Sequence, residues 1–444
     1  MKQALWNRIL GALDGIANAH STSPVPLDQS VSAFRVSLVM VGIAFTLTGL
    51  YTGSELATSL GLPTGIRASV LGAIVLTAMS VPAAVVGART RLSTYMIVSH
   101  VFGEGGSKVV NLILAIVLLG WYAVTAELFG RTFYLTALPY LRFDIPVWVF
   151  TVASSALVIA TTVFGFGAIN RLSLMAAPLL VALTVLVAWR ALGHSSWAAI
   201  YAIPGTHVDL ATGVSAVIGG WIVNVVLMPD VTRYSRSTFE CAVISFVGNG
   251  VGAAGALILA MLPALAFGQI DPMRYMAVLG LVGVAFAVLV VSTWTINAVN
   301  LYSTGLVTST AFRRVSYGRL VLLSGVIGTV FAVIGVADHL INFLVILGLV
   351  VPPIAAVYLT DFFILGRRDF SDVGNLENPM TNLNGLAGCF VGATLGLVMY
   401  YTHTSLTGVP TIESFLSAAI VYAAAEYARG WCARDRHWRR LAPL

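Results

Sequence analysis

Charged residues are scarce in this sequence. Lys, Arg, Asp and Glu together make up 9% of the 444 residues, whereas hydrophobic residues make up 58%. An ordinary soluble domain is about one quarter charged. The longest polar links, residues 89–108 and 367–382, are too short to bury a core of their own. The composition therefore argues against a soluble catalytic domain and predicts a chain embedded in lipid.

Motifs with a chemical signature are also missing. The three cysteines, Cys241, Cys389 and Cys432, have neither metal-binding nor redox spacing, and we expect them to serve packing. The sequence contains no HExxH, no Walker-type glycine loop and no GxSxG. We therefore expect no enzyme activity and no cofactor.

Apolar runs long enough to cross a bilayer, which takes about 20 residues per helix, are abundant. Charge, proline and glycine divide the chain into twelve such runs: 34–53, 65–88, 109–130, 146–167, 172–191, 211–229, 241–268, 276–309, 319–336, 340–366, 383–401 and 411–428. Backbone groups left unpaired in lipid are costly, and these runs lack the two-residue alternation of a membrane β-barrel. The predicted fold class is an all-α integral membrane protein with about twelve transmembrane helices.

The positive charges predict the orientation of the chain. With a cytoplasmic amino terminus, nineteen of the 24 Lys and Arg residues fall inside, and those outside are Arg67, Arg131, Arg142, Arg190 and Arg274. Residues 1–33 lack the apolar core and cleavage site of a signal peptide. We expect a multi-pass protein of the inner or plasma membrane with both termini cytoplasmic. The net charge of +6 then reflects topology and not nucleic-acid binding.

Two of the runs carry glycine and polar residues at bilayer depth. The first reads SLVMVGIAFTLTGLYTGSEL and the sixth reads VSAVIGGWIVNVVLMPDVTRY. Interrupted helices at matching places indicate a transporter built from an inverted repeat; glycines that only allow close helix packing are the alternative. The spacing predicts one repeat over 34–191, a second over 211–366 and two additional helices over 383–428, all within a single domain, 1–444.

The eighth run contains a stripe of hydrogen-bonding side chains. Thr293, Asn297, Asn300 and Thr304 are spaced by four, three and four residues, which places them along one helical face. An asparagine amide offers donors and an acceptor that suit the edge of a planar heterocycle. The alternative is that these amides link neighbouring helices. We favour a stripe that lines a cavity.

Two tryptophans lie far from the membrane interfaces where this residue usually gathers. Trp121 is in the third run and Trp221 is in the sixth, directly after Gly220. Two deep indoles can hold a flat ring between them, since stacking on a base contributes roughly 1–3 kcal/mol, although either one alone could fill the core. Glu127, six residues after Trp121, is a candidate proton carrier because carboxylates at this depth are often functional; the alternative is an interfacial residue, since Glu127 lies nearer the outer end.

Five stretches, in their order and spacing, resemble the nucleobase:cation symporter-1 family, most closely its bacterial cytosine permease and hydantoin transporter branches. They are VPLDQSVSAFRVSLVMVGIAFTLTGLYTGSEL, LGWYAV, GGWIVNVVLMPDVTRYSR, WTINAVNLYSTGL and VVPPIAAVYLTDFFILGRR. The resemblance spans the first ten helices. It implies a five-plus-five inverted-repeat core of the amino-acid/sodium symporter type, two added helices and alternating access. We therefore expect a secondary transporter, functional as a monomer, that imports a nucleobase or related planar heterocycle by cation coupling.

The resemblance also implies residue roles. The substrate ring would lie between the third, sixth and eighth helices, where Trp121 and Trp221 stack on it and Asn297 reads its edge; Gly220 and Asn300 complete the predicted substrate residues. A sodium ion would be bound by the backbone carbonyls of Gly42, Phe45 and Ser292 and by the hydroxyl of Thr295.

Three positions depart from the family pattern. Ile296 stands where the sodium motif has a hydroxyl residue, so the coupling ion could be sodium or a proton. Leu118 and Val223 replace a glutamine and a serine of cytosine permeases, and a site that cannot hydrogen-bond an exocyclic group loses discrimination for it. A hydantoin or a pyrimidine vitamin precursor is therefore an alternative to cytosine. A membrane-embedded ligand sensor without transport is the alternative from another class.

Overall fold

Helices form nearly all of the described chain, which comprises residues 24–26, 30–137, 145–164, 167–206, 208–312, 314–366 and 381–441 of a computed structural model. The only β-type pairing among these residues is an isolated bridge between Gly61 and Pro204. Seven of the described helices are long and apolar enough to cross a membrane, and three shorter apolar helices accompany them. The predicted all-α membrane class is confirmed, and the total of twelve spanning helices stays a prediction.

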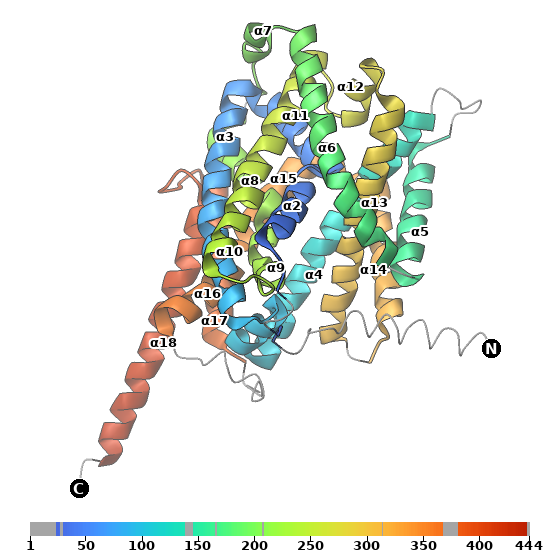
Figure 1. Cartoon of the computed structure of the whole chain (residues 1–444). Coiled ribbons are helices and arrows are strands. Elements are labelled where there is room, and N and C mark those ends of the chain that lie inside the picture. Colours follow the sequence, from blue (N-terminus) through green and yellow to red (C-terminus); the bar gives the residue numbers. More distant parts are fainter. Residues whose placement is uncertain are drawn as a thin grey trace, which may run out of the picture.

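The helices stand side by side as one bundle (Figure 1). In chain order they are α2 (Ala33–Ala44), α3 (Leu47–Thr90), α4 (Thr94–Ala137), α5 (Val147–Phe164), α6 (Gly167–His194), α7 (Trp197–Tyr201), α8 (Leu210–Val226), α9 (Met228–Thr232), α10 (Thr238–Ser245), η3 (Phe246–Gly252), α11 (Ala253–Phe267), α12 (Pro272–Val278), α13 (Val282–Ala311), α14 (Tyr317–Ile334), η4 (Val336–His339), α15 (Leu340–Val350), α16 (Pro352–Thr360), η5 (Asp361–Leu365), α17 (Leu383–Thr402) and α18 (Pro410–Leu441). Figure 1 places α7 and α12 toward one end of the bundle and α9 toward the other, and we call these the α7 end and the α9 end.

Some helix boundaries differ from the apolar runs. The first and second runs share the label α3 but form two helical segments on either side of a kink at Gly61 (φ 70°), and α4 begins at Thr94, well before the third run, with a kink at Gly103 (φ 71°). A glycine with positive φ lets the chain change direction without a polar linker. The eighth run is divided instead, because α12 ends at Val278 and α13 begins at Val282. The hydropathy of the residues does not mark these changes of direction.

Both predicted interruptions are present. Helix α2 ends at Ala44 and α3 begins at Leu47, while α8 ends at Val226 and α9 begins at Met228. The backbone turns tightly at the first break, since a Cβ on Gly49 would lie 2.1 Å from the carbonyl oxygen of Ala44. Two helices therefore end and restart inside the bundle, where their free backbone groups need partners.

At the second interruption, hydrogen-bond donors from other helices pair with the free backbone carbonyl. The carbonyl oxygen of Val226 accepts hydrogen bonds from the hydroxyls of Tyr358 (3.3 Å) and Thr94 (3.5 Å). The Asp230 carboxylate in α9 accepts the backbone N–H of Thr94 at 2.8 Å. These contacts hold α9 against α4 and α16, so this break is held by the surrounding helices.

Helices α8 and α15 cross at very short range. A Cβ on Gly219 would lie 1.7 Å from the carbonyl oxygen of Leu344, and a Cβ on Gly348 would lie 2.6 Å from that of Ser215. Only glycine allows two backbones to approach this closely. The crossing fixes the rotation of α8 and therefore the direction in which Trp221 points.

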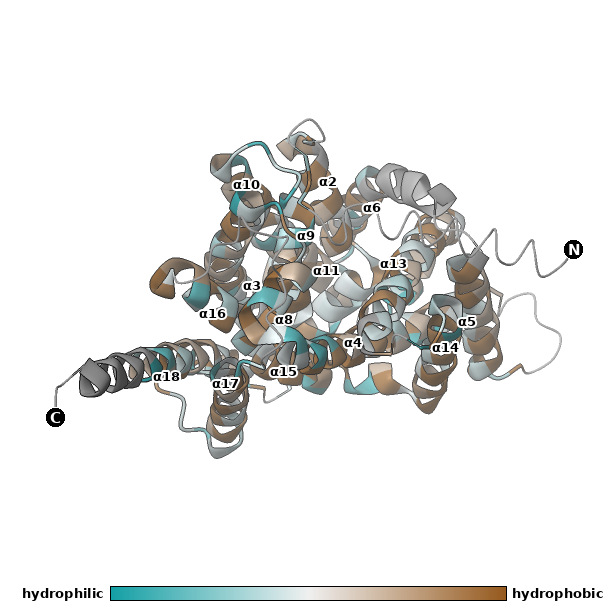
Figure 2. Cartoon of the chain, turned by 90° about the horizontal axis from the view of Figure 1, so that it is seen from below, coloured by the Kyte–Doolittle hydropathy of each residue, from teal (hydrophilic) through white to brown (hydrophobic). Residues whose placement is uncertain are grey.

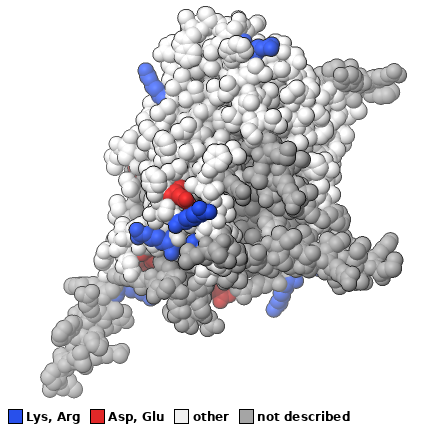
Figure 3. Space-filling view, viewed as in Figure 1, with Lys and Arg blue, Asp and Glu red and all other residues white. Residues whose placement is uncertain are grey.

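The outer surface of the bundle is apolar. Large side chains such as Ile334 of α14, Phe390 of α17 and Ile420 of α18 are 73%, 74% and 66% exposed. Figure 2 shows hydrophobic residues over much of the outward faces of α5 and α14. Figure 3 shows few charged side chains in the upper part of the face seen in Figure 1, where most of the visible ones gather lower down. An apolar surface of this extent indicates contact with lipid. The chain is a multi-pass membrane protein.

Two of the three cysteines have described side chains. Cys241 is a buried free thiol and Cys389 is a partly buried one. The side chain of Cys432 lies outside the described residues. In the part of the chain that is described, no group of His, Cys, Asp or Glu side chains is arranged to hold a metal ion.

Candidate functional site

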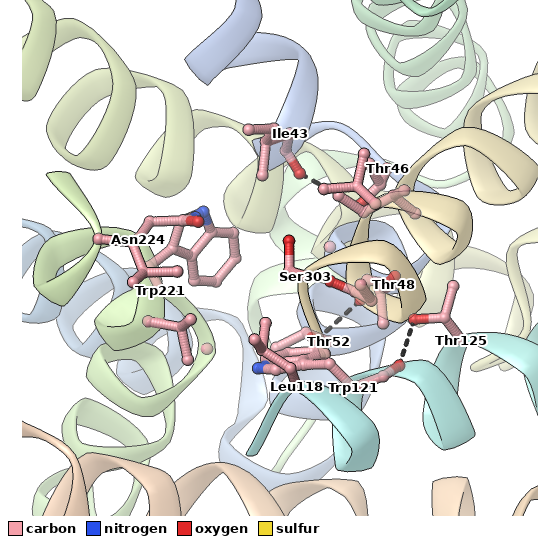
Figure 4. Close-up of a pocket in the computed structure, with 17 residues that line it drawn as sticks. Ile43, Thr46, Thr48, Thr52, Leu118, Trp121, Thr125, Trp221, Asn224 and Ser303 are labelled. Atoms are coloured by element: carbon pink, nitrogen blue, oxygen red, sulfur yellow. Dashed lines mark hydrogen bonds between the residues drawn. The ribbon is translucent and has the colours of Figure 1, made fainter. Parts of the chain in front are cut away.

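A cavity of about 150 Å³ lies beside both helix interruptions. Helices α3, α4, α8 and α13 and the residues around the α2 break form its wall (Figure 4). The lining residues are Ile43, Thr46, Thr48, Gly49, Thr52, Leu118, Trp121, Thr125, Gly220, Trp221, Val223, Asn224, Leu227, Ile296, Val299, Asn300 and Ser303. No ionisable side chain is among these described residues. The cavity is therefore suited to an uncharged ligand.

Two indoles border the cavity from different helices. Trp121 comes from α4 and Trp221 from α8 (Figure 4). Trp221 is 5% exposed, and Phe343 of α15 packs edge-on against Trp121 with the ring centroids 5.6 Å apart. The Phe343 contact restrains the Trp121 ring, and such rigid aromatic surfaces are the groups on which a planar ring stacks.

Four polar side chains in the wall are free to bind a ligand. Among the described residues, no protein hydrogen bond engages the side chains of Thr48, Asn224, Asn300 or Ser303. They belong to three helices, α3, α8 and α13, and converge on the cavity. A polar group left unpaired in a buried wall costs free energy until a partner satisfies it. These four groups are the hydrogen-bonding surface of the cavity.

The other threonines of the wall already have partners. The hydroxyls of Thr46, Thr52 and Thr125 donate to the carbonyls of Ile43 (3.1 Å), Thr48 (2.8 Å) and Trp121 (2.7 Å) within their own segments. Their donors are used, so these side chains contribute less to ligand recognition than the four free groups.

Most predicted substrate residues meet at this cavity. Trp121, Trp221, Gly220 and Asn300 all line it, and the position of a Cβ on Gly220 has no atom within 4 Å. Asn297 does not line it. Its side chain is 0% exposed, and neither its amide oxygen nor its amide nitrogen has a partner among the described residues. The polar stripe of the eighth run is thus divided between the cavity and the packed interior.

The departures from the family pattern also lie at the cavity. Leu118, Val223 and Ile296 all line it, so aliphatic groups stand where the resemblance implies hydrogen-bonding ones. The sequence interpretation missed Asn224 and Ser303 as site residues. The available signal was their spacing, since each follows a predicted site residue, Trp221 or Asn300, by one helical turn.

The candidate cation residues flank the same cavity on two sides. Gly42 and Phe45 lie at the end of α2, next to the lining residues Ile43 and Thr46, and Thr295 precedes the lining residue Ile296. In the described chain, no capping hydrogen bond reaches the carbonyl oxygens of Gly42 or Phe45, in contrast to the Val226 carbonyl.

Thr295 can contribute an acceptor. Its hydroxyl donates to the carbonyl of Val291 at 2.8 Å, which leaves the oxygen lone pairs available. Carbonyl and hydroxyl oxygens are suitable ligands for a small hard cation. These oxygens are of the chemical type that such a cation binds.

A second cavity, of about 660 Å³, lies at the α7 end. Arg131 binds the carboxylates of Glu127 and Asp338, the latter at 2.6 Å, and the backbone N–H of Ala337 donates to Glu127 at 2.7 Å. Asp271, between α11 and α12, also lines this cavity, and burial raises the pKa of its carboxyl. Glu127 therefore belongs to an ion-pair network outside the uncharged cavity.

The fold and the cavity define a class of protein: a helical membrane transporter with two interrupted helices beside an uncharged ligand site. The family model described as permease for cytosine/purines, uracil, thiamine, allantoin matches residues 24–410. The chain belongs to this family, whose members are permeases and not enzymes. Cytosine permeases of Escherichia coli K12 and O157:H7 are each 26% identical over 408 residues, which cover 91% of this chain and 93% of theirs.

Solved structures share the fold. The inward-facing conformation of Mhp1 matches with a TM-score of 0.81 at 17% identity and covers 94% of both chains. Mhp1, a nucleobase-cation-symport-1 family transporter, matches in a closed conformation with bromovinylhydantoin bound with a TM-score of 0.77 at 18% identity, covering 94% of this chain and 96% of that chain. A Na⁺-coupled sialic acid symporter matches with a TM-score of 0.60 at 13% identity, covering 94% and 95%. The predicted family and symporter-type fold are confirmed.

Proposed function

We propose that this protein is a secondary transporter that imports a neutral planar heterocycle, a nucleobase or a close relative, through the cavity lined by Trp121 and Trp221. The observation that carries the proposal is the wall itself, in which two indoles and four unpaired polar groups surround a space without ionisable side chains. Stacking would hold the faces of the ring, and the amide of Asn300 would bind its edge.

The uncharged wall supports a preference for neutral ligands over charged ones among the substrates of the family. Moving an ion from water into a site without a compensating charge costs several kcal/mol. A neutral ring such as uracil, cytosine or hydantoin avoids this cost, whereas a cation such as thiamine or an anion such as orotate does not. The aliphatic side chains of Leu118 and Val223 cannot hydrogen-bond an exocyclic group of the ligand. Hydantoin-type ligands and pyrimidine precursors are therefore candidates in addition to cytosine.

A matched pair of ligands tests this preference. Orotate is uracil with one added carboxylate, so the two differ mainly in charge. We expect uracil, cytosine or hydantoin to raise the melting temperature of the purified protein, since a ligand at 100 times its Kd stabilises by about 2.7 kcal/mol. Orotate and thiamine should have no effect at the same concentration. Equal stabilisation by orotate and uracil contradicts the neutral-ligand proposal.

Alternating access would use the two interruptions. The repeats proposed over 34–191 and 211–366 would rock against one another around the ligand, with the helices over 383–428 outside this core. In this arrangement the α9 end faces the cytoplasm of a cell with an inner or plasma membrane, and both termini lie on that side. The bundle encloses the cavity within one chain, which supports a functional monomer.

We propose sodium as the coupling ion, bound by the carbonyls of Gly42, Phe45 and Ser292 and the hydroxyl of Thr295. The uncapped carbonyls at the α2 break support this assignment. The proton alternative would use Glu127, whose carboxylate is engaged by Arg131 and the Ala337 N–H away from the substrate cavity. Ile296 removes one oxygen ligand, so we expect the sodium dependence of uptake to be weak.

Uptake into proteoliposomes with separately imposed sodium and proton gradients tests the coupling. We expect Ile296→Thr to lower the sodium concentration that gives half-maximal uptake of labelled uracil, because it supplies a further oxygen ligand. Val299→Thr is the matched control, since it adds a hydroxyl to the same cavity and helix at a position outside the cation set. If uptake ignores sodium in both wild type and Ile296→Thr, the cation assignment is wrong.

A further inference from the structure

The cavity has a second tier of polar groups nearer the α9 end. Asn224 follows Trp221 on α8, and Ser303 follows Asn300 on α13, by three residues each, or about 4.5 Å along a helix axis. Both helices run from the α7 end toward the α9 end (Figure 1). Asn224 therefore lies about one turn nearer the α9 end than Trp221, and Ser303 lies about one turn nearer the α9 end than Asn300.

These two side chains face the cavity and not other protein groups. Both are half-buried, and neither side chain has a hydrogen bond among the described residues. Figure 4 shows Ser303 reaching into the middle of the cavity, with Asn224 on the α8 side next to Trp221. Two polar groups from different helices are thus available to hydrogen-bond a ligand that enters the cavity.

Aliphatic side chains also border this part of the cavity. Leu118 precedes Trp121 by one turn on α4. Helix α4 runs in the opposite direction to α8 and α13, since Thr94 at its start contacts Asp230 of α9. Leu118 therefore also lies toward the α9 end, where it lines the cavity with Leu227. A substituent of the ligand that passes between Leu118 and Leu227 avoids a desolvation cost if it is uncharged. Its tip can reach the amide of Asn224 and the hydroxyl of Ser303.

A bare ring held between the indoles would satisfy the upper tier alone. Its own atoms are confined to the stacking plane and its edge, and Asn224 and Ser303 are a helical turn away. A polar substituent that projects from the ring toward the α9 end would bridge this distance. The amide of Asn224 and the hydroxyl of Ser303 each offer both donor and acceptor, which suits a hydroxyl, carboxamide or ureido tip.

We propose that the site is built for heterocycles with a neutral polar arm, whose tip hydrogen-bonds to Asn224 and Ser303 while the ring lies between Trp121 and Trp221. The inference rests on the proposed function and narrows its substrate class. It also assigns Asn224 and Ser303 as specificity-determining residues, in addition to the residues that bind the ring.

Two matched ligand pairs test the arm. Allantoin is hydantoin with a ureido arm, and 5-(hydroxymethyl)uracil is uracil with a hydroxymethyl arm. Calorimetric titration of the purified full chain should give a Kd for at least one armed ligand roughly tenfold below that of its armless partner, as expected for one or two buried hydrogen bonds. In Asn224→Leu and Ser303→Ala the ratio of the two Kd values should fall toward one.

Ser309→Ala is the matched control, because Ser309 lies on the same helix and its hydroxyl already donates to the carbonyl of Leu306. It should keep the wild-type ratio. Armed ligands that bind no more tightly than armless ones in wild type, or variants that weaken both members of a pair equally, overturn the inference while leaving the proposed function intact. If none of the four ligands binds wild type, the proposed function fails and the inference fails with it.

Discussion

Trp121→Ala is expected to weaken ligand binding by roughly 1–3 kcal/mol, which is about a 5- to 150-fold rise in Kd. Alanine removes the indole face that borders the cavity on α4 and also removes the partner of Phe343. Trp121→Phe keeps an aromatic face and should lose less. Equilibrium binding of uracil or hydantoin to the purified variants measures both changes.

The control for this substitution is Trp189→Ala. Trp189 lies on α6 with its side chain 69% exposed, outside the cavity, so the variant should bind like wild type. The melting temperatures of the variants without ligand show whether the fold has survived. An unchanged Kd in a folded Trp121→Ala variant would mean that the cavity is not the ligand site.

The second large effect concerns two asparagines of one helix. Asn300→Ala should weaken binding by about 1–3 kcal/mol, because the ligand edge loses its partner in a buried site. Asn297→Ala should leave binding nearly unchanged, since the Asn297 amide is fully buried and lies outside the cavity wall. This ranking reverses the role that the family resemblance implies for Asn297.

Binding and initial uptake should be measured for both variants under identical conditions. Asn297→Ala serves as the internal comparison, because it makes the same chemical change one helical turn away. Removal of an amide with no protein partner can even stabilise the fold, so the melting temperature should not fall markedly. Loss of binding in Asn297→Ala with retention in Asn300→Ala would support the implied role of Asn297 and contradict the geometry of the cavity.

The sequence carries enough information for the class of fold and for part of the site. Apolar runs of membrane length predict spanning helices, and the two runs with glycine at bilayer depth predict interruptions, which the structure places after Ala44 and Val226. Both rest on local chemistry, because lipid demands apolar residues and a helix break demands glycine or polar groups nearby. Trp121 and Trp221 could be found because tryptophan at mid-membrane depth is unusual.

The details that depend on helix rotation could not be predicted in the same way. The stripe from Thr293 to Thr304 identifies a polar face of the helix. It does not show which residues of that face line a cavity and which are buried against other helices. The cavity-facing side of α13 includes the aliphatic Ile296 and Val299, which no polarity pattern selects. The rotation is set by contacts between helices distant in sequence.

Asn224 and Ser303 were missed for a related reason. Each is a single polar residue whose importance arises only where α8 and α13 meet at the cavity. The turn of α3 at Gly61 also depends on a backbone angle, φ 70°, and not on the polarity of neighbouring residues. The spacing on one helix indicates a shared face, but it does not show which helices meet at the cavity.

Net uptake by reconstituted protein shows whether this chain transports the ligands that it binds. Labelled uracil, cytosine and hydantoin should each be offered to proteoliposomes containing wild type or Trp121→Ala, with an imposed sodium or proton gradient and with empty liposomes as the background. We expect wild type to accumulate at least one of these neutral rings above its external concentration, and Trp121→Ala to accumulate much less at a ligand concentration near the wild-type Kd. Saturable binding by wild type without accumulation under either gradient would contradict transport and indicate a ligand sensor instead.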